Sequence, residues 1–106
     1  MNRYQADALF FKAFCDENRL RIIEQLRQRE LCACHILDEL PISQSTLSHH
    51  MKIMVECHVV TARKDGKWVY YSLSEEGRHK AERLLKELIV NAGYHVEQSL
   101  CIDEEV

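Results

Sequence analysis

A change of hydrophobic period near the middle of the chain is the feature that most limits its fold. Residues 59–63, Val-Val-Thr-Ala-Arg, form a short run with high β propensity, and residues 68–73, Trp-Val-Tyr-Tyr-Ser-Leu, form a second. The segment 64–67 between them contains Asp-Gly, a dipeptide typical of a tight hairpin turn. The segments on either side have a helical pattern. The sequence therefore predicts a mainly helical chain with one inserted β-hairpin.

Four amphipathic helices are expected before the hairpin and one after it. Asp16 and Ser43 are residue types that cap a helix N-terminus, and Pro41 ends the helix that precedes it. The expected helices span residues 4–14, 16–29, 32–40, 43–57 and 75–99. The resulting order, ααααββα, is that of a winged helix-turn-helix, an α+β fold that is mainly α. The hairpin is the wing, and residues 43–57 are the recognition helix.

The second expected helix has a marked division between its two faces. Its apolar residues Leu20, Ile23 and Leu26 are expected to face the core. The opposite face is expected to be basic and exposed, with Arg19, Arg21, Arg27 and Arg29.

Length and composition limit the class of protein. The 106 residues suffice for one domain, 1–106. No apolar run approaches the roughly 18–20 residues that span a bilayer, and the N-terminal segment does not have the pattern of a signal peptide. We therefore expect a cytoplasmic protein with no membrane partner. In a reducing compartment the five cysteines are better interpreted as free thiols or metal ligands than as disulfides.

The distribution of charge favours a nucleic-acid partner more than the net charge of −3 suggests. Residues 43–73 carry a net charge of +2, whereas the rest of the chain carries −5. A locally basic segment attracts phosphate over about 8–10 Å at physiological salt. An ordinary solvated patch is the alternative interpretation.

The start of the recognition helix is rich in hydroxyl and amide side chains, which contact base edges and phosphates in the major groove. The wing adds basic residues that would follow an adjacent phosphate or the minor groove. Of the neighbouring His49 and His50, one is a candidate for DNA contact and the other for partial burial. Helix capping alone is the alternative explanation of the hydroxyl-rich start. The predicted DNA-binding residues are Ser43, Gln44, Ser45, Thr46, Ser48, His49, Lys52, Arg63, Lys64 and Lys67.

The first and last helices, 4–14 and 75–99, carry wider apolar faces than one small core requires. These faces favour a homodimer formed through the terminal helices. Such a dimer would present two recognition helices to half-sites about 34–36 Å apart, so a palindromic operator is expected. The alternative is that both helices cover the core of a monomer.

Cys32 and Cys34 form a Cys-x-Cys pair at the start of the third expected helix. Thiolates bind soft ions, and nearby helix amides lower thiol pKa values. On an intact helix, residues i and i+2 point about 200° apart, so both sulfurs reach one ion only if the first turn distorts. That distortion would link ligand binding to the neighbouring recognition helix. Two small cysteines packing a helix start are the alternative.

Four stretches carry a resemblance to a known family: residues 16–22, 30–34, 42–52 and 63–73. Together they resemble the ArsR/SmtB family of metal-sensing repressors, in particular its arsenic-responsive branch. The resemblance implies a homodimeric repressor of arsenical resistance genes, with no enzymatic activity and no organic cofactor. It further implies release from operator DNA when arsenite or antimonite binds Cys32 and Cys34.

The chain departs from the family pattern at the third thiol. In some arsenic sensors a cysteine follows three residues after the pair, where this chain has Leu37. Cys15, Cys57 and Cys101 are the candidate third ligands, and an exogenous ligand is the alternative.

The zinc-sensing relatives place carboxylate and histidine ligands on the last helix. Here Gly77 stands where a histidine is expected, and neither His79 nor His95 restores the spacing. A zinc site on that helix is therefore not expected. His35 and His58 are weaker options for a borderline metal such as zinc.

Other inputs to the cysteine pair remain open. The same thiols suit cadmium, lead or zinc, and they also suit oxidation by peroxide or a sulfur species. A thiol oxidoreductase or a metal-buffering protein is a third class, but the chain lacks Cys-x-x-Cys spacing and a βαβ unit.

Overall fold

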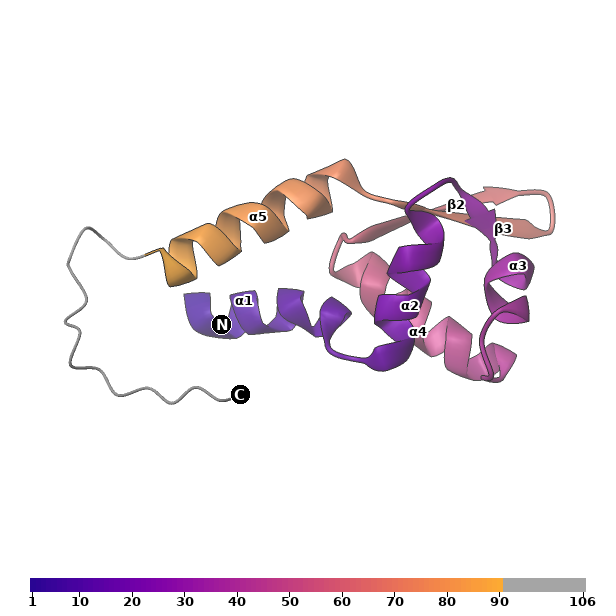
Figure 1. Ribbon diagram of the computed structural model, residues 1–106, viewed down its shortest axis with the longest axis horizontal. Coiled ribbons are helices and arrows are strands. Elements are labelled where there is room, and N and C mark those ends of the chain that lie inside the picture. Colours follow the sequence, from indigo (N-terminus) through magenta and orange to yellow (C-terminus); the bar gives the residue numbers. More distant parts are fainter. Residues whose placement is uncertain (91–106) are drawn as a thin grey trace, which may run out of the picture.

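The computed structural model describes residues 1–90, and within them the chain forms helices joined by one three-stranded antiparallel sheet (Figure 1). The elements are α1 (Arg3–Phe11), the 3-10 helix η1 (Lys12–Phe14), α2 (Glu17–Leu26), β1 (Leu31–Cys32), α3 (Ala33–Asp38), α4 (Gln44–Glu56), β2 (Val60–Asp65), β3 (Trp68–Leu73) and α5 (Glu75–Ile89). The predicted winged helix-turn-helix is confirmed, with one strand and one 3-10 turn that the sequence pattern did not predict.

The helix boundaries follow local capping chemistry. Asp16 Oδ2 accepts hydrogen bonds from the backbone N–H of Asn18 (2.8 Å) and Arg19 (3.3 Å), which begins α2 one residue later. Ser43 Oγ accepts from the backbone N–H of Thr46 at 3.1 Å, which begins α4. Both predicted caps are confirmed. Satisfying these amides stabilises each helix by about 1 kcal/mol.

Several helices were predicted to be longer than they are. The first helix ends at Phe11 and continues as η1, the second ends at Leu26 rather than 29, and the third occupies only Ala33–Asp38. Hydrophobic period does not report where a helix tightens or stops. The last helix runs to Ile89, and the remainder of the predicted range 75–99, from residue 91, lies outside the described residues.

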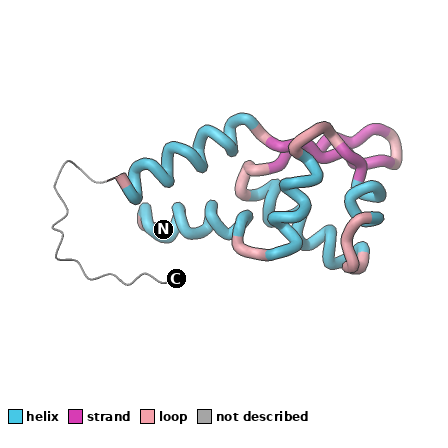
Figure 2. The backbone as a smooth tube through the Cα atoms, viewed as in Figure 1, coloured by secondary structure: helices cyan, strands magenta, loops and turns pink. Residues whose placement is uncertain are grey.

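The wing is the β2–β3 hairpin, and β1 pairs with the other edge of β3 (Figure 2). Gly66 and Lys67 form the two-residue loop, and Gly66 has φ +64°, a left-handed conformation that glycine adopts without strain. In β1, Leu31 pairs with Tyr71 and Cys32 with Tyr70. The wing is therefore hydrogen-bonded to the segment that precedes α3.

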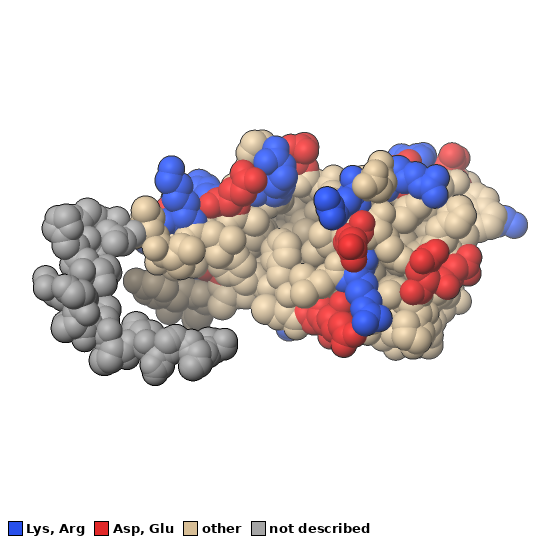
Figure 3. Space-filling view, in the orientation of Figure 1, with Lys and Arg blue, Asp and Glu red and all other residues tan. Residues whose placement is uncertain are grey.

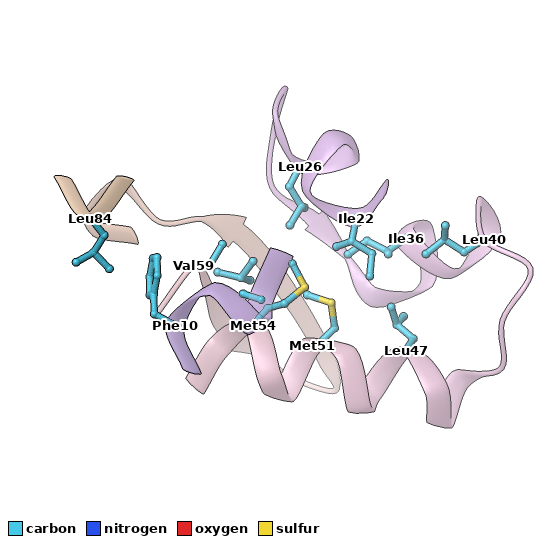
Figure 4. Packing of buried hydrophobic residues seen from close by; sticks show 12 residues of the cluster. Phe10, Ile22, Leu26, Ile36, Leu40, Leu47, Met51, Met54, Val59 and Leu84 are labelled. Carbon is cyan, nitrogen blue, oxygen red and sulfur yellow. The ribbon is translucent and has the colours of Figure 1, made fainter. Parts of the chain in front are cut away.

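The core lies where α2, α3, α4 and the sheet meet (Figure 4). Met51 and Met54 of α4 point into it toward Ile22 and Val59. Its buried members are Phe10, Ala13, Ile22, Leu26, Ile36, Leu40, Leu47, Met51, Met54, Val59, Val60 and Leu84. This packing positions α4 with one face buried and the other free.

The inner face of α2 differs from the prediction. Leu20 is 52% exposed, whereas Arg19, expected on the basic outer face, is buried. The true inner face follows Arg19, Ile22 and Leu26, whose spacing of three and four is as helical as that of the residues predicted. The hydrophobic period fits both of these faces of α2. It could not choose between them because a sequence pattern does not show whether a buried arginine would find a hydrogen-bond partner.

α1 and α5 lie side by side and extend away from the core (Figure 1). Arg3 of α1 and Glu87 of α5 form an ion pair at 3.9 Å, and Lys80 Nζ lies 4.9 Å from the Phe10 ring centroid. Within residues 1–90 no helix has both the length and the apolarity needed to cross a membrane.

Candidate functional site

One face of α4 is exposed along its length. Leu47, His50, Met51 and Met54 are buried against the core, so the opposite side of the helix faces solvent. The exposed side carries every residue that was predicted there for DNA contact: Ser43, Gln44, Ser45, Thr46, Ser48, His49 and Lys52. Of the histidine pair, His49 is the exposed member and His50 the buried one.

The hydroxyl groups at the start of α4 already bond to one another. Ser43 Oγ donates to Thr46 Oγ1 at 3.0 Å and lies 3.2 Å from Ser45 Oγ. Capping therefore accounts for part of the hydroxyl-rich pattern. Gln44 and Ser48 instead line a groove of about 320 Å³ between α4 and the wing, with Lys67 and Trp68 on its other wall. The groove brings the recognition helix and the wing together.

The basic residues of the wing fall into two groups. Lys64 and Lys67 are exposed, and Lys67 Nζ lies 5.6 Å from the centre of the Trp68 ring. Arg63 is held by Glu30, with Nε–Oε2 and Nη2–Oε1 distances of 3.0 and 2.7 Å. Figure 3 shows basic and acidic side chains interspersed over one face of the molecule. Of the three basic residues of the wing, Lys64 and Lys67 are therefore available for phosphate, whereas Arg63 is paired with a carboxylate.

Cys32 and Cys34 lie at a junction between strand and helix, and their sulfur atoms are 2.7 Å apart. Cys32 is the last residue of β1 and the N-cap of α3, with extended φ −79° and ψ 158°. The expectation that helix geometry separates the two sulfurs is therefore wrong. The rotation of 100° per residue applies only inside a helix, and Cys32 precedes it.

The two thiols are electrostatically different. A hydrogen bond from the Cys34 thiol, assisted by the backbone N–H of His35, lowers the pKa of Cys32. The same hydrogen bond, seen from the donor, raises the pKa of Cys34. Cys32 is therefore the thiol of the pair that ionises more readily, and Cys34 is the one that retains its proton more readily. Cys32 is buried, whereas Cys34 is exposed and lines the groove beside α4.

The candidate third ligands lie apart from this pair. The Cys15 thiol donates to the carbonyl oxygen of Phe11, and the Cys57 thiol donates to that of Leu9. Burial raises the pKa of Cys57, which disfavours its thiolate. Among residues 1–90 no group of three or more His, Cys, Asp or Glu side chains is arranged to hold a metal. Cys101 lies outside the described residues.

The two histidine options differ in position. His35 Nδ1 lies 3.5 Å from Cys32 Sγ, so His35 is the nearer option for a borderline metal. His58 lies in the turn between α4 and β2, where it adopts φ +63°.

Gly77 in the first turn of α5 packs directly against this α4–β2 turn. A Cβ added to Gly77 would overlap the carbonyl oxygen of His58 and lie 2.8 Å from the Cα of Val59. No side chain fits there, so the packing of α5 against this turn requires glycine at position 77.

A buried polar contact between α2 and α4 was not predicted. Arg19 Nη1 lies 3.0 Å from His50 Nδ1, and both residues are 7% exposed. His50 Nε2 lies 3.7 Å from Asp16 Oδ2, and Arg19 Nε has no partner among the described residues. Burial lowers the pKa of His50. The sequence signal was the spacing of Arg19 with Ile22 and Leu26, which places the arginine on the buried face.

The exposed face of α4, the adjoining wing and the core that holds them define a winged helix-turn-helix DNA-binding protein. Comparison with known proteins gives the family. The sequence pattern described as "Bacterial regulatory protein, arsR family" matches residues 16–62.

An HTH-type transcriptional regulator of Methanocaldococcus jannaschii is 38% identical over 89 residues, covering 83% of this chain and 100% of the relative. The arsenical resistance operon repressor of Staphylococcus aureus is 44% identical over 71 residues, covering 67% of this chain and 68% of the relative. A crystal structure of a possible transcriptional regulator for arsenical resistance superposes with a TM-score of 0.71 at 26% identity, covering 77% of this chain and 85% of the other. The chain therefore belongs to the ArsR family of DNA-binding transcriptional repressors and is not an enzyme.

Proposed function

We propose that this protein is a homodimeric repressor that leaves a palindromic operator when trivalent arsenic or antimony binds Cys32 and Cys34. The observation that carries the proposal is the sulfur pair, 2.7 Å apart, with the hydrogen bond that favours a thiolate at Cys32. The name of the Staphylococcus aureus relative, an arsenical resistance operon repressor, supports the same input.

The chemistry of the pair suits a soft, trivalent centre. Arsenous acid, As(OH)3, condenses with two thiols to form two As–S bonds, and the two thiol protons leave with two hydroxyl groups as two molecules of water. The third position keeps its hydroxyl group or takes an exogenous thiol, since no third cysteine among residues 1–90 lies with the pair. The exposed Cys34 provides access to the site.

Ligand binding at the two sulfurs acts on two elements of the fold at once. Two bonds to one arsenic centre would join Cys32, at the end of β1, to Cys34, in the first turn of α3. Forming these bonds therefore acts on β1, through Cys32, and on the first turn of α3, through Cys34. Cys34 shares its groove with Gln44 and Ser48 of α4 and with Lys67 and Trp68 of the wing. A movement of Cys34 therefore changes the space between the recognition helix and the wing.

DNA contact in this proposal comes from α4 and the tip of the wing. Gln44 pairs with adenine by two hydrogen bonds, and the serine and threonine hydroxyls contact bases or phosphates. Lys52, Lys64 and Lys67 contact phosphates without reading sequence. The proposed DNA-contacting residues are Ser43, Gln44, Ser45, Thr46, Ser48, His49, Lys52, Lys64 and Lys67.

Exposed apolar side chains on α1 and α5 support the dimer. Tyr4 is 71% exposed and Ile89 75%, and Leu9, Leu85 and Leu88 are each about half exposed. These residues belong to the two helices that extend away from the core. A second copy of the chain packed against these helices would remove the apolar side chains from water. Leu88→Glu should reduce the mass of the particle in solution by about half, and an unchanged mass would contradict this interface.

The test of the ligand site is release of labelled operator DNA by arsenite. The variant Cys32→Ser/Cys34→Ser should bind the operator without arsenite and should retain it when arsenite is added. The matched control, Cys15→Ser/Cys57→Ser, should release DNA like the wild-type protein. Unchanged release by the first variant would refute the site.

A second candidate input is oxidation, because the sulfurs already lie close enough to join with little movement. One molecule of hydrogen peroxide would oxidise the two thiols to a disulfide and be reduced to two molecules of water. Mass spectrometry should then show the loss of two hydrogens from the Cys32–Cys34 peptide, together with reversible release of DNA. Release by peroxide without that mass change would exclude this input.

A further inference from the structure

Glu30 joins the segment before β1 to both strands of the wing. Its carboxylate accepts two hydrogen bonds from the Arg63 guanidinium of β2, at 3.0 and 2.7 Å. It also accepts one from the Ser72 hydroxyl of β3, at 3.3 Å. These three contacts connect one carboxylate to both β2 and β3.

Arg63 is occupied on several sides. Its guanidinium carbon lies 4.6 Å from the centre of the Tyr70 ring, and Nη1 lies 3.7 Å from Asp65 Oδ2. A guanidinium held in this way must break its two charge-assisted hydrogen bonds to Glu30 and move away from the Tyr70 ring before it can bind phosphate. The next residue, Lys64, is exposed and has no ion pair with any residue from 1 to 90. Of these two neighbouring basic residues of β2, Arg63 is therefore engaged by protein groups, whereas Lys64 is available to bind phosphate.

Arg63 lies in the same cross-strand row of the sheet as Cys32. Cys32 of β1 is paired with Tyr70 of β3, and Tyr70 is paired with Arg63 of β2. Directly opposed residues share one face of a sheet, so the row passes from the thiol segment through the ring to the guanidinium. Glu30, two residues before Cys32, adds a second connection along the same edge. A shift of β1 is therefore carried to the wing by both the row and the carboxylate.

We propose that Glu30 and Arg63 form a positioning clamp that sets the angle of the wing on the operator and connects it to Cys32. In this assignment Arg63 is not a phosphate ligand, which revises its place among the predicted DNA-binding residues. The inference rests on the proposed function, in that the wing contacts DNA and Cys32 senses the ligand. Removing the clamp weakens operator binding through the wing and weakens the response to the ligand.

The first experiment measures operator affinity by fluorescence anisotropy over a range of salt concentrations. Removing one protein–phosphate ion pair reduces the slope of log K against log salt by about 0.9. Lys64→Gln, the matched control, should reduce the slope by that amount for each subunit. Arg63→Gln should weaken binding several-fold while leaving the slope unchanged. A reduced slope for Arg63→Gln would overturn the clamp, because it would show that Arg63 contacts phosphate.

The second experiment tests whether the two residues act as one unit. Glu30→Gln and Arg63→Gln should each lower affinity, and the double variant should be no weaker than either. The exchanged pair Glu30→Arg/Arg63→Glu should recover affinity that Glu30→Arg alone loses. Additive losses of affinity, or no recovery by the exchanged pair, would overturn the clamp.

A third experiment, with arsenite, distinguishes a failure of the clamp from a failure of the proposed function. Arsenite should lower the operator affinity of the wild-type protein. The fold-decrease in operator affinity caused by arsenite should be smaller for Glu30→Gln than for the wild type. If arsenite leaves the wild type bound, the proposed ligand is refuted, and the clamp is still decided by the salt slopes and the exchanged pair. If arsenite releases wild type and Glu30→Gln by the same factor, the connection to Cys32 is refuted.

Discussion

The buried contact between Arg19 and His50 predicts that acid weakens this protein. His50 Nδ1, 3.0 Å from Arg19 Nη1, must be an acceptor because the guanidinium has only donors. Burial lowers the pKa of His50 below its ordinary value, and the Arg19 and His49 charges act in the same direction while Asp16 opposes them. In the folded protein the imidazole therefore loses its proton more readily than in the unfolded chain.

The sign of the pH effect follows from linkage. As pH falls below about 6.5, the ordinary pKa of histidine, the unfolded chain takes up a proton that the folded protein does not. The free energy of unfolding therefore decreases with falling pH through 6.5 and levels off below the folded-state pKa. Protonation at Nδ1 removes the acceptor for a buried Arg19 N–H, which costs about 1–3 kcal/mol, partly offset by attraction to Asp16. We expect a net decrease of about 1 kcal/mol, or roughly 4–8 °C in Tm for a domain of this size.

The assay is thermal unfolding, followed by circular dichroism, between pH 7.5 and pH 5.5. His50→Gln is the informative variant because its side-chain oxygen can accept the Arg19 hydrogen bond but does not titrate. Its Tm should fall less than that of the wild-type protein over this range, while His49→Gln should follow the wild type. All other titrating groups are shared, so the difference isolates His50. Equal pH dependence of wild type and His50→Gln would refute the reasoning.

Two further predictions concern the helix packing and the groove. Gly77→Ala should destabilise the protein by about 1–3 kcal/mol in denaturant unfolding, although alanine favours helix, because its Cβ would collide with the backbone at His58; a stabilised variant would contradict that packing. Trp68, the single tryptophan, is 48% exposed and shares its groove with Cys34, so arsenite should change its fluorescence emission. Cys34→Ser should abolish the change, and an unaltered signal in the wild-type protein would count against movement in the groove.

The long, strongly patterned elements were predictable from the sequence. The hairpin was recognisable because β-branched and aromatic residues flank Asp-Gly, and the caps Asp16 and Ser43 have a local mechanism that needs no tertiary contact. The exposed face of α4 followed in the same way, because Leu47, Met51 and Met54 repeat at helical spacing. Strand β1 was not predictable, since two residues contain no period, and it exists only through its pairing with β3.

By itself the sequence determined the order of helices and wing, the family and the Cys-x-Cys spacing, because these depend on residue type and spacing along the chain. Only the tertiary structure decided the environment of individual side chains. It placed Cys32 outside the helix and close to Cys34, buried Arg19 against His50, and engaged Arg63 with Glu30. Each of the last two contacts joins residues more than 30 positions apart. Local pattern cannot encode such a partner, since charge and hydrogen bonding depend on which elements the fold brings together.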